Sequence, residues 1–335
     1  MTIYDELPAI YRIKRAQTDV DRIANEFYEA SLDLDPVLAT EHGRTGVETL
    51  FGDYSPAGEE AYAKLVKKTL KKLDKVIPID DTDLVTLDAM QERLTLTRQM
   101  RRAGLGRWQL NNIFSAPQQI RTSFDLMSRE NERDWTHIAG RLANVPGAID
   151  GFIQTLDAAR AEGKVSPRRQ VQIVIEQAEA YIADGGFFDA LAAEITAAAP
   201  AITEQAREGA QAAKDGYRAL ITYLRDTLLP EAPSKDAVGR ELYTLYSRES
   251  LGASIDLDET YAWGVQELER IITEQHTVAS EIEPGASIER AKELLDMDPV
   301  RALHGTEALR EWMQTHADTA VEALAGTHFD IGARC

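Results

Sequence analysis

The feature that most constrains this chain is the recurrence of helix start and stop signals along an apolar periodicity of three to four residues. Asp35 with Pro36, and Ser55 with Pro56, each place a capping side chain directly before a proline, a composition typical of a helix start. No stretch alternates apolar and polar residues convincingly, as a half-buried strand would. The pattern therefore predicts an all-α protein, built as a multi-helix antiparallel array.

Expected helix boundaries follow from the same signals. Thr18 is placed to cap a helix that reaches about Leu32, and residues 83–102 should form another helix. Residues 131–143 should form a helix that ends before Pro146, because proline disfavours the interior of a helix. A new helix should then run from Pro146 to about Gly163. We expect a single helical unit over residues 1–331, with a subdivision near residue 145.

The sequence of a later predicted helix contains both a start signal and an apolar face. Asp256 and Glu259 have the spacing of a capping box, with aspartate in the usual place of serine or threonine. Behind them, one face is apolar and consists of Leu257, Tyr261, Val265, Leu268 and Ile272. This pattern predicts a helix with one continuous apolar stripe.

The charge of the chain excludes some classes of partner. Its 335 residues include 37 Lys and Arg against 56 Asp and Glu, a net charge of −19. Such an acidic chain is not expected to bind nucleic acid, because phosphate neutralisation needs clustered basic residues. No window of eighteen apolar residues occurs, and acids stand near the start where a signal peptide would be basic, so we expect no membrane partner and a cytoplasmic location. The single cysteine, Cys335, excludes an intrachain disulfide and a multi-cysteine zinc site.

One section of the chain departs from this acidity. Residues 61–145 carry a net charge of +5, and six lysines there share one arc of a predicted helix: Lys64, Lys67, Lys68, Lys71, Lys72 and Lys75. The arc has two readings. It is either a binding surface, for an acidic partner or for an acidic part of the same protein, or a solvated polar face. The second is the usual arrangement of a surface helix.

No motif for catalysis or metal binding emerges from the residues themselves. The six histidines do not form an H-E-x-x-H pair, and His304, Glu307 and His316 should point apart around their helix. The chain also lacks a G-x-S-x-G elbow and a phosphate-binding glycine loop. We therefore predict no catalytic residue and no metal ligand within this chain.

The stretch before Gly252 contains the best candidates for lining a substrate cleft. Arg248 has the geometry to clamp a carboxylate through two parallel hydrogen bonds, and Tyr243 and Tyr246 are placed to line the same cleft. The alternative is that both tyrosines pack with their hydroxyls at the surface and that Arg248 pairs with a neighbouring acid.

Four segments, taken in order, resemble the N-terminal part of a bacterial family, domain-of-unknown-function family 885. They are D-P-V-L-A-T-E-H-G at 35–43, the stretch V-P-G-A-I-D-G-F-I-Q-T-L-D at 145–157 that continues to Val171, Y-R-A-L-I-T-Y-L-R-D-T-L-L-P at 217–230, and L-D-E-T-Y-A-W-G-V-Q-E-L-E-R-I at 257–271. The resemblance reaches about Ile331, and residues 332–335 look like a tail outside the family pattern.

The resemblance implies a helical fold like that of zinc carboxypeptidases and oligopeptidases, in which long helices wall a deep cleft. Complete members are expected to bind zinc through an H-E-G-x-P-G-H-H type motif downstream of the region matched here and to act on peptides. This chain contains no such motif, which suggests a truncated, frameshifted or split member.

Two functions are therefore open. The first is the N-terminal, cleft-forming helical region of a metal-dependent peptidase-like protein, inactive by itself, with no cofactor of its own. Apolar surface left uncovered would favour self-association. The alternative is a stand-alone helical interaction module that binds a protein partner.

Overall fold

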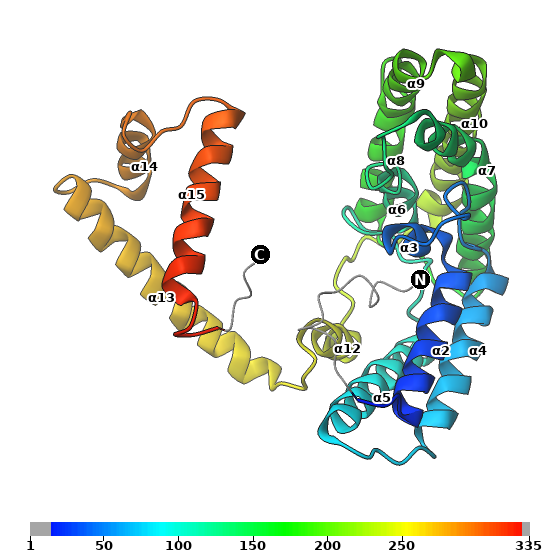
Figure 1. The fold of residues 1–335 in the computed structure, drawn as a ribbon, viewed down its shortest axis with the longest axis horizontal. Coiled ribbons are helices and arrows are strands. Elements are labelled where there is room, and N and C mark those ends of the chain that lie inside the picture. The colour runs from blue at the N-terminus through cyan, green and yellow to red at the C-terminus, as the bar shows by residue number, and fades with distance from the viewer. Residues whose placement is uncertain (1–14, 330–335) are drawn as a thin grey trace. The chain divides into compact units, whose positions relative to one another are not determined.

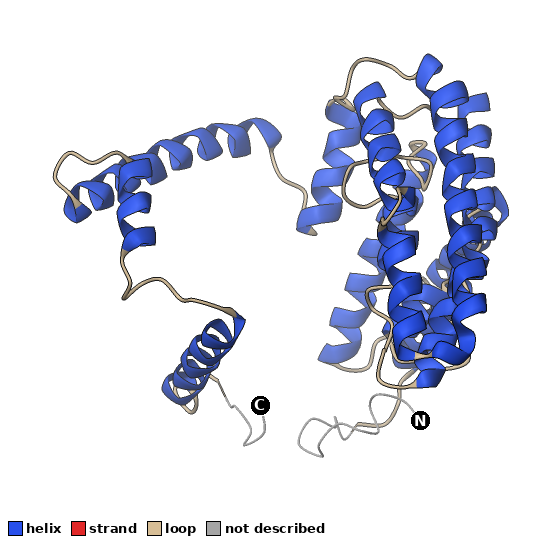
Figure 2. Cartoon of the chain, turned by 90° about the horizontal axis from the view of Figure 1, so that it is seen from above, coloured by secondary structure: helices blue, strands red, loops and turns tan. Residues whose placement is uncertain are grey.

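A computed structural model describes residues 15–329 of the chain, and the regular secondary structure in this range is helical throughout (Figure 2). The one β-type pairing in the described range is an isolated bridge between Ala325 and Phe329. The all-α prediction is thus confirmed. The expected tail at 332–335, including Cys335, lies outside the described residues.

The contacts between residues divide the chain into two units, residues 1–254 and residues 255–335. The helices of the first unit are α2 (Asp19–Leu34), α3 (Pro36–Glu41), α4 (Pro56–Leu73), α5 (Asp81–Arg102), α6 (Ala116–Thr122), α7 (Glu132–Ala161), α8 (Arg168–Ile182), α9 (Phe187–Ala198), η2 (Pro200–Ile202), α10 (Thr203–Tyr223), η3 (Leu224–Leu228), α11 (Leu229–Glu231) and α12 (Arg240–Leu251) (Figure 1). Those of the second are α13 (Leu257–Ile282), α14 (Ile288–Met297) and α15 (Thr306–Leu324). The expectation of a single helical unit over residues 1–331 stays a prediction.

Capping residues place most helix starts where the sequence predicted them. Thr18 accepts from the backbone N–H of Asp21, whose carboxylate accepts from the Thr18 N–H in turn, which completes a capping box. Asp35 caps α3, with Pro36 as its first residue. Ser55 caps α4 in the same way. Each cap satisfies backbone donors that the first turn of a helix leaves free.

The predicted break at Pro146 is wrong. α7 runs for 30 residues, with Pro146 inside it, so residue 145 lies within one helix. The proline removes one backbone hydrogen bond, but the helix buries twelve of its residues, among them Ile138, Leu142, Ile149 and Phe152. Burial on this scale outweighs the local penalty of one proline.

The main core of the first unit lies between α7 and α10. Gly209 and Gly216 of α10 face α7 and allow the two helices to approach closely. A Cβ at Gly209 would lie 3.0 Å from the Ala139 carbonyl oxygen, and one at Gly216 would lie 3.1 Å from the Cα of Pro146. The two helices therefore pack backbone to backbone, and Pro146 itself is part of the contact.

Tyr217 lies at the centre of this core. Its side chain is fully buried, with its ring centroid 5.3 Å from that of Phe188 and 5.8 Å from that of Tyr181. Its hydroxyl donates a 2.6 Å hydrogen bond to the carbonyl of Pro117, the second residue of α6. Tyr217 thus links α10 to α6, a segment one hundred residues earlier in the chain.

A smaller core joins α2, α4 and α5, and a buried carboxylate anchors its edge. Asp83 is fully buried and accepts hydrogen bonds from Thr18 Oγ1 (2.7 Å), from the Ile79 N–H (3.1 Å) and from Arg15 (3.3 Å). Burial alone would raise the pKa of Asp83, but these donors together lower it below its usual value. Asp83 therefore ties the start of α2 to the start of α5.

The second unit has almost no core of its own. In residues 255–329 the buried residues are Ala279 and Ala291, where α13 packs against α14. Large apolar side chains of α13 and α15 stay exposed, among them Tyr261, Trp263, Leu268, Trp312 and Met313. This unit presents surface that in most soluble proteins is covered.

Candidate functional site

The three side chains predicted to line a cleft lie on α12, and the charged one, Arg248, already has partners within the protein. Arg248 Nε donates to Glu92 Oε1 at 2.8 Å, its Nη2 pairs with the other oxygen of the same carboxylate, and its Nη1 donates to Gln99 Oε1 at 3.2 Å. The hydrogen bond from Arg248 lowers the pKa of Glu92. α12 is thereby attached to α5.

The two tyrosines of α12 are in different surroundings. The Tyr246 hydroxyl accepts a hydrogen bond from the amide of Gln109, whereas Tyr243 is 56% exposed. A substrate carboxylate would have to displace Glu92 before Arg248 could bind it. The role of Tyr243, Tyr246 and Arg248 in a substrate cleft stays a prediction.

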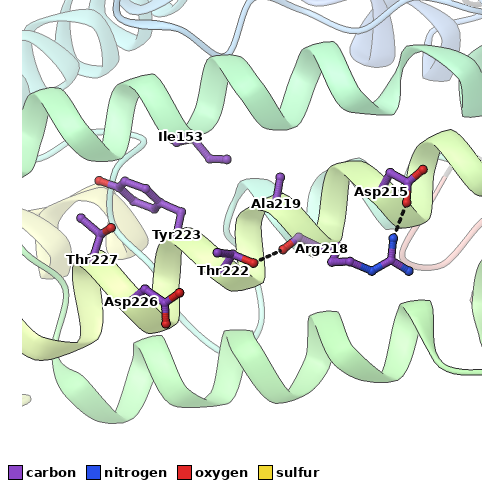
Figure 3. Close-up of a pocket in the computed structure, with 8 residues that line it drawn as sticks. All are labelled: Ile153, Asp215, Arg218, Ala219, Thr222, Tyr223, Asp226 and Thr227. Atoms are coloured by element: carbon purple, nitrogen blue, oxygen red, sulfur yellow. Dashed lines mark hydrogen bonds and ion pairs between the residues drawn. The ribbon is translucent and has the colours of Figure 1, made fainter.

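A groove that sequence reasoning did not find runs along α10 and η3, opposite Ile153 of α7 (Figure 3). It has a volume of about 570 Å³ and is open to solvent. Asp215 and Arg218 form an ion pair at one end, and Tyr223 and Thr227 lie towards the other. Because Arg218 already has its acid partner, the described residues that line the groove offer hydrogen-bonding groups to a small polar molecule and no free cation.

At neutral pH the phenol of Tyr223 in this groove is protonated, so it donates a hydrogen bond and does not act as a base. Burial, and then the charge of Asp157, raises the pKa of Tyr223 to about 12. Its hydroxyl donates to Asp157 Oδ1 at 3.3 Å, and Arg160 donates both to Asp157 (2.9 Å) and to Glu231 (2.9 Å). These bonds join α7 to α11, so their role is to hold the turn after η3.

Sequence reasoning also missed a buried guanidinium. Arg141 of α7 is 1% exposed, its Nη2 donates to Thr40 Oγ1 (2.8 Å) and its Nη1 to the Ser123 carbonyl (3.4 Å). Its Nε has no hydrogen-bond partner within the described part of the chain, and burial lowers its pKa to about 10. The position was detectable, because Arg141 lies on the same face of its helix as Ile138 and Leu142.

Tyr54 is buried beside Arg141, and its pKa predicts how the stability of the protein changes at alkaline pH. Burial raises the pKa of Tyr54 to about 12, above the value of about 10 in an unfolded chain. Below pH 10 the phenol is protonated in both the folded and the unfolded chain. As the pH rises towards 12 the unfolded chain loses this proton first, which lowers the free energy of unfolding by about 2 kcal/mol at pH 12. We expect the free energy of unfolding, measured in urea from pH 8 to 12, to fall less steeply in Tyr54→Phe. An unchanged slope in that variant would contradict the assignment.

Five of the six lysines of the predicted arc lie on α4, and Lys75 follows the end of that helix. Lys64, Lys67, Lys68, Lys71 and Lys75 are exposed, and Lys72 is half-buried and pairs with Glu26 of α2. Within residues 15–329 no group of three or more His, Asp or Glu side chains could hold a metal ion. Gly305, at φ 87°, precedes α15 and places His304 outside that helix. The described residues therefore do not fit the zinc that the sequence resemblance led us to expect in complete members.

A match to the model of a protein family shows the family to which this chain belongs. The model of the family described as "Bacterial protein of unknown function (DUF885)" matches residues 36–334, most of the chain. The chain belongs to this family. The match to DUF885 extends past Ile331, where we expected the family pattern to end.

Two solved structures resemble this DUF885 chain in fold. One is described as "the putative lipoprotein from Colwellia psychrerythraea", with a TM-score of 0.67, 14% identity, and coverage of 92% of this chain and 59% of that one. The other is "a putative lipoprotein of unknown function from Shewanella oneidensis", with a TM-score of 0.61, 14% identity, and coverage of 92% and 57%. This chain thus spans less than three fifths of each of these structures. No curated protein matches it.

Both solved structures are described as putative lipoproteins, which makes it relevant whether a helix of this chain could cross a membrane. In residues 15–329, no helix combines the length and the apolarity needed to cross a bilayer.

Proposed function

We propose that this chain is the N-terminal helical, cleft-forming part of a metal-dependent peptidase-like protein and has no peptidase activity by itself. The observation that carries the proposal is the unequal coverage: the fold match spans 92% of this chain but 59% of the Colwellia structure. A protein with this fold can therefore contain a further part, which we call the completing part. The resemblance of the four segments to peptidase-like proteins supports the choice of activity.

The residues of this chain would then shape a substrate site and not perform the chemistry. Within the described range no carboxylates and histidines converge on a metal site, so we assign no catalytic step to them. In this proposal the α12 side chains would contact a peptide after Glu92 releases Arg248. We also propose a cytoplasmic location, as expected from the sequence, and no nucleic-acid partner.

Metal content tests this proposal. Purified chain, loaded with excess zinc and then desalted, should retain far less than one zinc per chain by elemental analysis. A chelator-treated sample is the matched control. Stoichiometric zinc that survives desalting would show a metal site in this chain and reject the proposal.

A specific observation also supports the second function, an interaction module. The apolar stripe of α13, predicted from Leu257 to Ile272, is exposed in its own unit. A long uncovered stripe is the usual mark of a helix-binding surface.

A further inference from the structure

The stripe of α13 is longer than the sequence pattern suggested. Its members fall within an arc of roughly 140° at 100° per residue. They are Leu257, Tyr261, Val265, Leu268, Ile271, Ile272, Val278 and Ile282. Tyr261 is 77% exposed, Leu268 56% and Val278 49%. Covering such a stripe would remove a large apolar area from water, which is the main favourable term in association.

The stripe continues into a groove. Between α13 and α14 lies a concave space of about 300 Å³, lined mostly by apolar side chains that include Ile271, Val278 and Leu295. Glu274 and Lys292 are its charged side chains. A groove that prolongs an apolar stripe along one helix fits the apolar face of a second helix.

The edges of the stripe are acidic. Glu267, Glu274 and Glu281 recur every seven residues along one edge, and Glu269 lies on the other. Arg270 binds Glu267 at 2.7 Å and Glu274 at 2.8 Å, whereas Glu269 and Glu281 form no ion pair with any described residue. Residues 255–329 as a whole carry 5 Lys and Arg against 16 Asp and Glu, a net charge of −11.

We propose that the α13 stripe and groove form a docking surface for an amphipathic helix whose apolar face is flanked by lysine and arginine, and that the completing part of the fold supplies this helix. The source of the helix rests on the proposed function. Complementary charge favours this occupant, because basic side chains would meet the free carboxylates at the edges. A second copy of the chain is disfavoured, because pairing two α13 stripes would bring acidic edges together.

The experiment uses the full chain and two designed helical peptides of about 20 residues with the same Leu and Ile face. One peptide has lysine at its flanking positions and the other has glutamate. Titration calorimetry should show that the lysine peptide binds at least roughly tenfold more tightly, with an affinity that falls as salt rises. Equal affinity for both peptides, or no binding of either, would overturn the proposal.

Two double variants localise the binding. Leu268→Asp with Ile272→Asp changes exposed stripe residues and should abolish binding. Leu84→Asp with Val85→Asp changes exposed apolar residues of α5 and should leave it unchanged. Helix content by circular dichroism confirms that each variant folds. Glu269→Lys with Glu281→Lys should reverse the preference between the two peptides.

Other occupants are outcomes of the same test. Dimerisation in light scattering that the stripe variant abolishes would assign the surface to a second copy and overturn the proposal. Sedimentation with phosphatidylcholine vesicles that the same variant abolishes would assign it to a lipid surface, with the same consequence. If the chain binds no peptide but is also free of zinc and inactive, this inference alone is overturned. The proposed function would then stand.

Discussion

Replacing Tyr217 with alanine is expected to lower the free energy of unfolding of the first unit by about 3–5 kcal/mol. The side chain is fully buried between Phe188 and Tyr181, so its loss leaves a large cavity in the main core. The variant also removes the hydroxyl that donates to the carbonyl of Pro117. Because the two contributions differ in origin, a second variant separates them.

Tyr217→Phe keeps the ring and removes the hydrogen bond alone, at an expected cost of about 1–3 kcal/mol. Unfolding in urea can be followed by tryptophan fluorescence, because Trp108 and Trp135 pack against this core whereas Trp263 and Trp312 are already exposed. The exposed Tyr243→Ala is the matched control and should change stability by less than about 0.5 kcal/mol. Equal losses in Tyr217→Ala and Tyr243→Ala would show that the core is not centred where we place it.

The second large effect is expected at Gly209. A leucine there would drive its Cβ to 3.0 Å from the Ala139 carbonyl oxygen and from Leu142 Cβ, so α10 and α7 would have to separate. Overpacking of this kind costs about 1–3 kcal/mol or more, which exceeds the gain of about 1 kcal/mol from replacing a glycine inside a helix.

Gly147 of α7 provides the control for Gly209. Apart from its chain neighbours and the nearby backbone of its own helix, no atom lies within 4 Å of a Cβ built at Gly147, so Gly147→Ala should gain stability through helix propensity, by up to about 1 kcal/mol. Thermal unfolding of the two variants should therefore shift in opposite directions. A stabilised Gly209→Leu variant would contradict the close packing of α7 on α10.

Helix starts could be predicted from the sequence because capping is local chemistry. Thr18, Asp35 and Ser55 satisfy backbone donors two or three residues away, so the signal and its effect lie in the same short stretch. The apolar face of α13 was readable for the same reason, since periodicity along one helix needs no knowledge of its neighbours.

Features that depend on distant segments could not be predicted in this way. The sequence around Pro146 indicates a helix break, because the residue that packs against Pro146, Gly216, lies seventy residues later. For Arg248 the sequence allowed both a carboxylate clamp and a pair with a neighbouring acid, but it did not indicate that the acid is Glu92 of α5, 156 residues earlier. Arg141 lies on an apolar face, but nothing near it in the sequence announces Thr40 and Ser123 as its partners.

Hydrolysis of peptides by the purified 335-residue chain tests the central claim most directly. The assay would incubate a mixed peptide pool with the chain in the presence of added zinc, with and without a chelator, and detect products by mass spectrometry. Our account predicts the same product profile as in the absence of protein. Peptide cleavage that copurifies with the chain and that the chelator abolishes would contradict it.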